Sequence, residues 1–243
     1  MTERSLPVVD ELRPARGVSL SELTGEALSR YGIAGCVQRL ARIAGHRLRE
    51  LPGIGEYHIW YALGLPAARR AVSVPGGFEC TRAGMDALAL LSGFETLGML
   101  EARHRLASGA AELWLTRVAG EVACICWIYR GRTPVRAVPG GWLSLPADVA
   151  CIEDVITADR YRGRGLAPAS WARVAEAQAR SGVRTLISKV ETDNVSSRRA
   201  FLKAGFRSVA SMTFERLWWA RRATIEPEDE ERCPRFLLEQ IRY

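Results

Sequence analysis

Alternating and helically spaced apolar positions predict a succession of short strands and helices along most of this 243-residue chain. The strand-like runs are residues 57–63, 78–81, 112–118, 122–129, 151–157, 185–190, 208–213 and 214–220. The helix-like runs are residues 27–50, 86–91, 97–106, 166–180 and 195–204, and a glycine- and proline-rich loop covers 131–146. This order predicts a mixed α/β fold (α+β, mixed sheet) whose first strands are largely antiparallel.

The same pattern predicts three parts. Residues 1–76 indicate an N-terminal helical extension with one strand, residues 77–222 the main domain, and residues 223–243 an acidic linker and C-terminal tail. Arginines line one side of the helix expected at 27–50, which would suit a membrane surface or a nucleic acid. A helix that docks on its own domain with a solvated basic face is the favoured interpretation.

Composition narrows the class of protein. The net charge of +7 favours anionic ligands without saying which. No apolar run reaches the ~18 residues of a membrane span, and the N-terminus lacks a secretion signal, so a cytoplasmic protein is expected. Six cysteines without CxxC spacing favour reduced thiols and no metal site.

The stretch DRYRGRGLA at 159–167 is the strongest candidate for ligand chemistry. Gly163 and Gly165 directly precede a predicted helix, whose first N–H groups have no partner within the helix. A pyrophosphate can accept those hydrogen bonds where no Cβ blocks its approach, and Arg162 and Arg164 would add charged contacts. The alternative is a basic turn in which the glycines only supply positive φ.

Two stretches resemble the GNAT superfamily of acyl-CoA-dependent N-acetyltransferases. IEDVITADRYRGRGLAPA resembles the motif [RQ]-x-x-G-x-[GA], which Arg162, Gly165 and Ala167 fit. ETDNVSSRRAFLKAGF is similar to the family's next segment. The matching positions there are Asn194, Ser197, Phe201, Lys203, Gly205 and Phe206. The resemblance covers residues 150–207 firmly and says little about residues 1–76.

The resemblance implies a GNAT-like fold in which the fourth and fifth strands splay around the pantetheine arm of acetyl-CoA. Here those strands are residues 151–157 and 185–190. A backbone N–H near Val155 would polarise the thioester carbonyl. The residues expected at the cofactor are Val155, Ile156, Thr157, Arg162, Gly163, Arg164, Gly165, Leu166, Ala167, Asn194, Ser197 and Phe201.

Glu153 is the candidate base that removes a proton from the acceptor amine, with Asp154 in reserve. Strand alternation groups Cys151, Glu153 and Val155 on one face, and residues 152, 154 and 156 on the other. The alternative for Glu153 is an acid that pairs with a nearby arginine.

The chain departs from the family at two positions. A glutamate often found on the fifth strand is replaced by Lys189, and the tyrosine that often serves as general acid is replaced by Phe201. A cysteine nucleophile at Cys151 would need a matching histidine, which the pattern does not supply.

The resulting hypothesis is an N-acetyltransferase that transfers an acetyl (acyl) group from acetyl-CoA to a primary amine by direct attack. The alternative is a catalytically weak or inactive CoA-binding or nucleic-acid-associated module of the same fold. The expected partner is an amine of unknown identity; a membrane is not expected, a nucleic acid is disfavoured, and a homodimer stays open.

Overall fold

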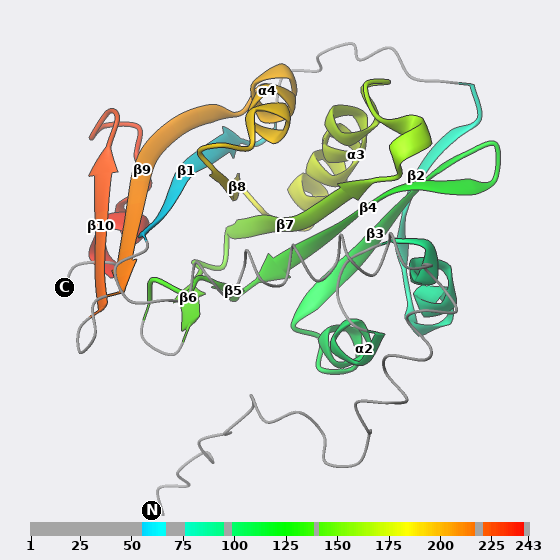
Figure 1. Cartoon of the computed structure of the whole chain (residues 1–243), viewed down its shortest axis with the longest axis horizontal. Helices are drawn as coiled ribbons and strands as arrows, with labels where there is room; N and C mark the ends of the chain where they lie inside the picture. Colours follow the sequence, from blue (N-terminus) through cyan, green and yellow to red (C-terminus); the bar gives the residue numbers. More distant parts are fainter. Residues whose placement is uncertain (1–54, 67–75, 95–98, 139–140, 217–220, 241–243) are drawn as a thin grey trace, which may run out of the picture. The chain divides into compact units, whose positions relative to one another are not determined.

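The computed structural model describes residues 55–66, 76–94, 99–138, 141–216 and 221–240, which form one eight-stranded sheet and a small two-stranded sheet, together with helices (Figure 1). The large sheet has the order β10-β9-β1-β8-β7-β4-β3-β2. Its strands are β1 (Gly55–Gly64), β2 (Phe78–Ala83), β3 (Ala111–Val118), β4 (Glu121–Arg130), β7 (Val149–Thr157), β8 (Thr185–Glu191), β9 (Arg207–Arg216) and β10 (Arg221–Pro227). The mixed α/β fold predicted from the sequence is confirmed. The helix expected at 27–50 lies outside the described residues.

β2, β3, β4 and β7 form an antiparallel half of the sheet. The β3–β4 turn has positive φ at both Ala119 (50°) and Gly120 (82°). Two such residues match the right-handed twist of the flanking strands, which is why the Ala-Gly pair marks a tight hairpin. The strands expected at 112–118 and 122–129 are therefore confirmed.

Among the described strands, β7 and β8 are the one parallel pair, and they share few ladder positions. The pairs are Val149↔Thr185, Ala150↔Leu186 and Cys151↔Ile187. Beyond them the strands are no longer paired, as the resemblance to a splayed fold implies. We call the opening between residues 152–157 of β7 and residues 188–191 of β8 the fork.

A β-bulge interrupts β7 beside the fork. Between Ile125 and Trp127 of β4 the pairing register shifts, so that β7 carries one extra residue. Asp154 lies in the bulge with a φ of 47°. A bulge of this kind turns the following residues of the strand and disturbs the ladder.

The bulge makes the predicted alternation of β7 wrong after Glu153. Ile152 and Val155 pack in the apolar cluster under the helices of one face, whereas Cys151 and Ile156 belong to the cluster on the other face. Alternation assumes one residue per ladder step, and the extra residue reverses it. Val155 therefore does not share a face with Cys151.

β1 lies inside the sheet, antiparallel to β8 on one side and to β9 on the other. Its residues belong to the range that the sequence pattern assigns to the N-terminal extension, 1–76. The compact unit that contains the sheet begins at Pro52. The sheet thus includes a strand from well before residue 77.

The end of the chain differs from the predicted boundaries. The pattern predicts strands at 208–213 and 214–220, but Met212 and Phe214 are both buried and continue the alternation, so β9 extends to Arg216. β10 then reaches Pro227, into the acidic run expected to be a linker. A short helix, α5 (Arg235–Gln240), follows it.

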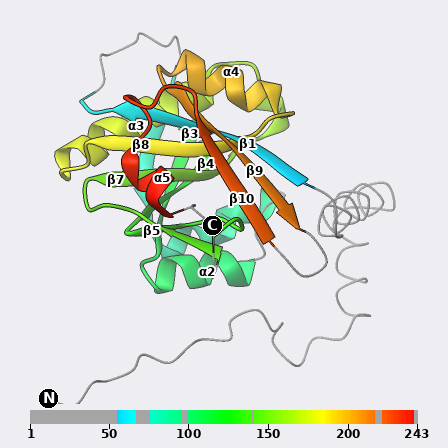
Figure 2. The ribbon, with the colours of Figure 1, turned by 90° about the vertical axis from the view of Figure 1, so that its left-hand side faces the viewer.

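Helices cover both faces of the sheet, as Figures 1 and 2 show. α3 (Leu166–Arg180) and α4 (Val195–Lys203) pack on one face, around Trp171, Val174 and Phe201. The other face is covered by the 3-10 helix η1 (Met85–Gly93), by α2 (Met99–Ala107), by α5 and by the hairpin β5 (Arg132–Pro134)–β6 (Trp142–Ser144). That hairpin lies in the stretch predicted as an irregular loop.

Candidate functional site

The loop between β7 and α3 contains a 3-10 turn, η3 (Asp159–Tyr161), followed by two glycines in the left-handed region. Gly163 has a φ of 75° and Gly165 a φ of 73°. Side chains are disfavoured there by about 1–2 kcal/mol, so the glycines fit the backbone that the loop requires. A Cβ added at Gly163 would meet no protein atom within 4 Å, so the space beside it is open.

The backbone amides of Gly163 to Ala167 donate no hydrogen bond to any described residue. Gly165 is the N-cap of α3 and offers no side chain to cap the helix. Pro168 lacks an N–H, and the next amide, of Ala169, already bonds the Gly165 carbonyl at 3.2 Å. The result is a set of donors without a partner among the described residues, at the positive end of a 15-residue helix, where an anion binds well.

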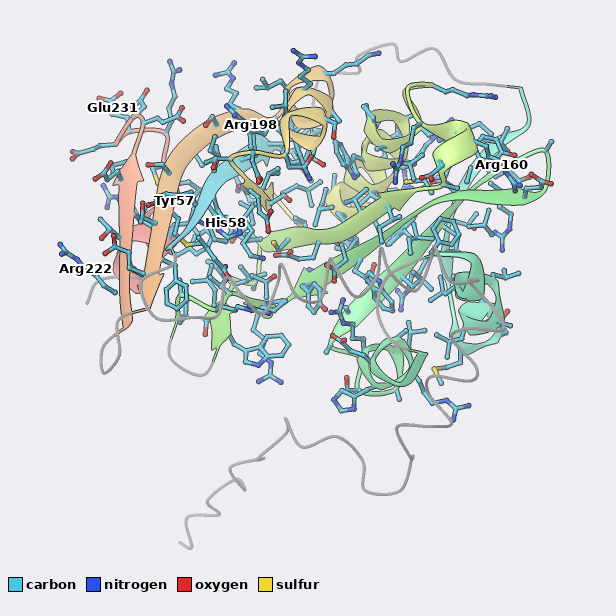
Figure 3. All side chains as sticks on the ribbon, viewed as in Figure 1. Tyr57, His58, Arg160, Arg198, Arg222 and Glu231 are labelled. Atoms are coloured by element: carbon cyan, nitrogen blue, oxygen red, sulfur yellow. The ribbon has the colours of Figure 1, made fainter. Side chains whose placement is uncertain are left out.

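The arginines of this loop have different surroundings. Arg160, which Figure 3 labels, forms an ion pair with Glu121 at 2.8 Å. Arg162 turns back onto its own loop, where its Nε donates to the Thr157 carbonyl at 3.2 Å and its Nη2 lies 2.8 Å from an Asp159 carboxylate oxygen. Arg164 makes no ion pair with the described residues, so it is the arginine available to an anion.

Tyr161 anchors the loop to the start of β4, a contact that the sequence pattern does not reveal. Its hydroxyl donates to Glu121 Oε2 at 2.7 Å, and this hydrogen bond raises the pKa of Tyr161. The guanidinium groups of Arg160 and Arg164 lie over the Tyr161 ring, with their central carbons 5.2 and 5.6 Å from the ring centroid. The tyrosine therefore holds the loop that carries the open amides.

The fork lies on the strand that leads into this loop. Ser188 of β8 donates its hydroxyl to the Ile152 carbonyl of β7 at 2.8 Å, where the strand ladder has just ended. Val155, Ile156 and Thr157 follow on β7 and are half-buried. A strand that has lost its neighbour presents alternate N–H and C=O groups along that edge. An extended amide-bearing chain could pair with this edge.

Glu153 is buried, and three donors converge on one of its oxygens. Oε1 accepts hydrogen bonds from Lys189 Nζ at 2.5 Å, from the Thr133 hydroxyl at 3.2 Å and from the Cys151 thiol at 3.4 Å. Oε2 contacts none of the described residues and is not among the fully buried atoms. The charged partner predicted as an alternative, a local arginine, is in fact the lysine of β8.

The partners of Glu153 come from three separate parts of the chain. Thr133 lies on β5, in the predicted loop, and its side chain is fully buried. Burial lowers the pKa of Lys189, but Glu153, Cys151 and Asp154 together outweigh burial and raise it above its usual value. Sequence reasoning noted Lys189 only as a departure from the family and missed Thr133, because neither position carries a local signal of the contact.

Asp154 forms an ion pair with a residue other than Lys189. Its carboxylate lies 2.6 Å from Arg105 of α2, which also pairs with Glu101. The Arg105 guanidinium lies over the rings of Trp127 and Tyr129, 5.4 and 5.5 Å from their centroids. Asp154 is thus tied to α2, whereas Glu153 keeps one oxygen free.

Asn194 and Ser197, two of the predicted cofactor residues, meet at the start of α4. Asn194 caps the helix, because its side-chain oxygen accepts the Ser197 backbone N–H at 3.1 Å. The Ser196 hydroxyl donates to the same oxygen at 3.0 Å. These contacts stabilise the N-terminus of α4 and explain the residue types without a ligand.

Phe201 lies in an aromatic cluster and not on the surface. Its ring stacks on Trp171 at 4.0 Å and on Tyr61 at 5.5 Å, and meets Phe206 edge-on at 5.0 Å. It is 3% exposed. The contacts seen for Phe201 are therefore those of a core residue.

We expect Phe201→Ala to lower the free energy of unfolding by about 3–5 kcal/mol, because it opens a cavity among three rings. Urea denaturation measures this change. The neighbouring Leu202 is 51% exposed, and Leu202→Ala should stay within about 0.5 kcal/mol of the wild type. Equal effects of the two substitutions would contradict the packing described.

Cys151 is buried beside Glu153. Burial raises the pKa of its thiol well above the usual value, and the adjacent carboxylate raises it further. A thiol in this state is a poor nucleophile, since the thiolate is the reactive form. This environment favours direct transfer over a covalent cysteine intermediate.

Three further features of the described residues bear on the site. No cluster of three or more histidine, cysteine or acidic side chains could hold a metal ion. No described helix is long and apolar enough to cross a membrane. A hollow of about 630 Å³ borders Leu63, Thr185 and Arg207, near the start of β8, and includes none of the residues predicted for the cofactor.

Residues 91–206 match the sequence model of the acetyltransferase (GNAT) family. Solved structures similar to the chain include a Novosphingobium aromaticivorans protein that its name places in the GNAT family, at 20% identity and a TM-score of 0.47, over 70% of this chain and 64% of that one. A GNAT-family acetyltransferase from Colwellia psychrerythraea is similar at 14% identity and a TM-score of 0.48, over 75% and 61%. The chain thus spans less than two thirds of the length of either protein. No curated protein sequence matches it.

Proposed function

Residues 91–206 form a GNAT-family acetyltransferase domain, and from this premise we propose that the protein transfers an acyl group from acetyl-CoA to a primary amine. The observation that carries the proposal is the run of open amides at 163–167 beside the fork. Members of the family use acetyl-CoA, which supplies a diphosphate for such amides and a pantetheine arm for the edge of β7. The acetyl group and the amine acceptor are part of the proposal.

Coenzyme A would bind along a path that begins at the N-terminus of α3. Its diphosphate would accept hydrogen bonds from the amides of Gly163 to Ala167, helped by the dipole of α3 and by Arg164. Its pantetheine amides would pair with the edge of β7 at Val155, Ile156 and Thr157. The thioester would then lie in the fork, next to the bulge and Glu153.

Glu153 is the proposed general base. An amine must lose its proton before it can attack a thioester, and a carboxylate in reach of that proton, directly or through one water, can accept it. Oε1 is held by three donors, so Oε2 is the oxygen left to take the proton. A backbone N–H of the bulge would stabilise the oxyanion that forms when the amine attacks.

The proposal is tested by calorimetric titration of the full chain with coenzyme A, followed by an amine panel with acetyl-CoA in which release of free thiol is measured. Binding together with amine-dependent thiol release supports the enzyme. Binding without thiol release from any amine would favour the alternative, a CoA-binding module without catalysis. No binding at millimolar coenzyme A and modest salt would end both interpretations.

We expect Thr133→Val to lower kcat roughly tenfold, because a lost hydrogen bond to a charged group is worth about 1.5 kcal/mol. The substitution keeps the shape of the side chain and removes only the hydroxyl that positions Glu153. Thr116→Val removes another buried threonine hydroxyl, which bonds Ser170 at 2.6 Å under α3, and serves as the control. An unchanged kcat for Thr133→Val would show that the hydroxyl does not position the carboxylate.

A further inference from the structure

Four side chains form a row across four strands on the α2 face of the sheet. Glu153 of β7 is directly opposite Trp127 of β4, and Lys189 of β8 is directly opposite Trp60 of β1. Directly opposed residues of antiparallel strands share a face. Glu153 and Lys189 join the two halves through their ion pair. We call Trp127, Glu153, Lys189 and Trp60 the fork row.

The ion pair spans the fork at its narrow end. The last ladder pair of β7 and β8 is Cys151↔Ile187, and Glu153 and Lys189 lie two residues further along their strands. Their backbones are not paired, yet Nζ and Oε1 are 2.5 Å apart. A group that enters the fork between the strands at this level meets the ammonium of Lys189.

Lys189 is well placed to hold a charge in this position. Its side chain is 15% exposed, and its charged or titratable neighbours are Glu153, Asp154 and Cys151, all on β7. The element on its other side, β1, presents the uncharged Trp60. Among the described residues, the carboxylates that neutralise the ammonium therefore all lie on β7.

The two tryptophans of the fork row close the site from both ends. Both side chains are 0% exposed, and their indole N–H groups are buried without a hydrogen-bond partner among the described residues. The ion pair therefore lies between two large buried rings that carry no charge.

We propose that the Lys189 ammonium receives the sulfur of coenzyme A, stabilises the departing thiolate and gives it a proton. The inference rests on the proposed function. It assigns the role of general acid to Lys189, because Phe201 has no proton to donate. The neutral amine nitrogen bonds to the acyl carbon and loses one proton to Glu153, and the carbon–sulfur bond breaks with its electron pair on sulfur. Sulfur then takes a proton from Nζ. Protonated Glu153 returns its proton to the neutral lysine, which restores the ion pair.

The ion pair makes the two transfers depend on each other. While Glu153 is a carboxylate it raises the pKa of Lys189, so the lysine keeps its proton. When Glu153 has taken the proton of the amine, that charge disappears and burial remains, which lowers the pKa of Lys189. The lysine becomes a proton donor at the stage when the thiolate leaves.

The first test needs no acceptor amine. The full chain is saturated with coenzyme A at neutral pH, and the ultraviolet absorbance of the thiolate is read against the same protein with dethio-coenzyme A, which lacks the sulfur. A free thiol with a pKa of about 8.5 is mostly protonated there, and a nearby ammonium lowers the thiol pKa and so raises the fraction present as thiolate. We expect a thiolate signal above that of free coenzyme A in the wild type and in Lys189→Arg, and the loss of this excess in Lys189→Gln.

The outcomes separate this inference from the proposed function. No binding of coenzyme A overturns both. Binding in the wild type without a thiolate signal, or an equal signal in Lys189→Gln, overturns the role of Lys189 alone. If Lys189→Gln does not fold, the thiolate signals of the wild type and of Lys189→Arg test the role of Lys189, since arginine keeps the charge and the pairing with Glu153.

The second test is kinetic and uses the amine that the panel identifies. Arginine holds its proton too tightly to donate it, so Lys189→Arg should lower kcat roughly hundredfold with little change in the KM for acetyl-CoA. A structural or purely electrostatic lysine would be rescued by arginine. Wild-type kcat in Lys189→Arg would therefore overturn the proton-donor role.

Discussion

Replacing Glu153 by glutamine is expected to lower kcat by roughly 10²–10³-fold while the Kd for coenzyme A stays near its wild-type value. Glutamine keeps the size of the side chain and can still accept a hydrogen bond from Thr133 and Lys189. It cannot take a proton from an amine. The measurement is thiol release from acetyl-CoA with the amine found in the panel, together with calorimetric titration of coenzyme A.

The matched control for this variant is Glu79→Gln. Glu79 is an exposed acid on the edge strand β2, three strands from β7, so its substitution should leave kcat unchanged. A Glu153→Gln enzyme as fast as the wild type would mean that the buried carboxylate only neutralises Lys189. Asp154→Asn would then become the variant to measure, since Asp154 is the other acid of the bulge.

The second large effect is expected in the loop between β7 and α3. There, Gly163→Ala should weaken binding of coenzyme A at least about tenfold, equivalent to ~1.4 kcal/mol. The added Cβ meets no protein atom within 4 Å, so the loop can keep its shape apart from the strain of a positive φ. The added methyl group would occupy the open space through which a diphosphate would reach the amides. Calorimetry gives the Kd, and thermal unfolding gives the cost in stability.

Gly109→Ala is the matched control, because it introduces the same backbone strain of a positive φ outside the loop between β7 and α3. Gly109 has a φ of 66° and also has open space around it, in the turn between α2 and β3. Both variants should lose about 1–2 kcal/mol of stability, whereas only Gly163→Ala should bind coenzyme A more weakly. Equal Kd values for the two variants would show that the diphosphate does not approach Gly163.

Some features of the fold could be predicted because their causes are local. The helix predicted at 166–180 begins directly after Gly165 and ends before Ser181-Gly182, and α3 has these bounds, Leu166–Arg180. The β3–β4 turn follows from Ala119-Gly120 in the same way. The phosphate-binding hypothesis also needed only neighbouring residues, since a helix start and its preceding loop are continuous in the chain.

Other features could not be predicted because they depend on which strands become neighbours. The bulge in β7 exists only in its register with β4, and that register decides on which face Val155 lies. The order β8-β1-β9 brings a strand from before the family match to the middle of the sheet. No periodicity in residues 55–64 indicates that position.

By itself the sequence determined the resemblance to the GNAT family, the mixed α/β fold and the glycine loop before α3, because short-range backbone geometry and residue type are sufficient for each. Only the tertiary structure decided what surrounds Glu153. Thr133, Lys189 and Trp60 come from β5, β8 and β1, and they reach the fork through long-range strand pairing and packing. Contacts between residues so far apart leave no pattern along the chain, although they set the charge around Glu153.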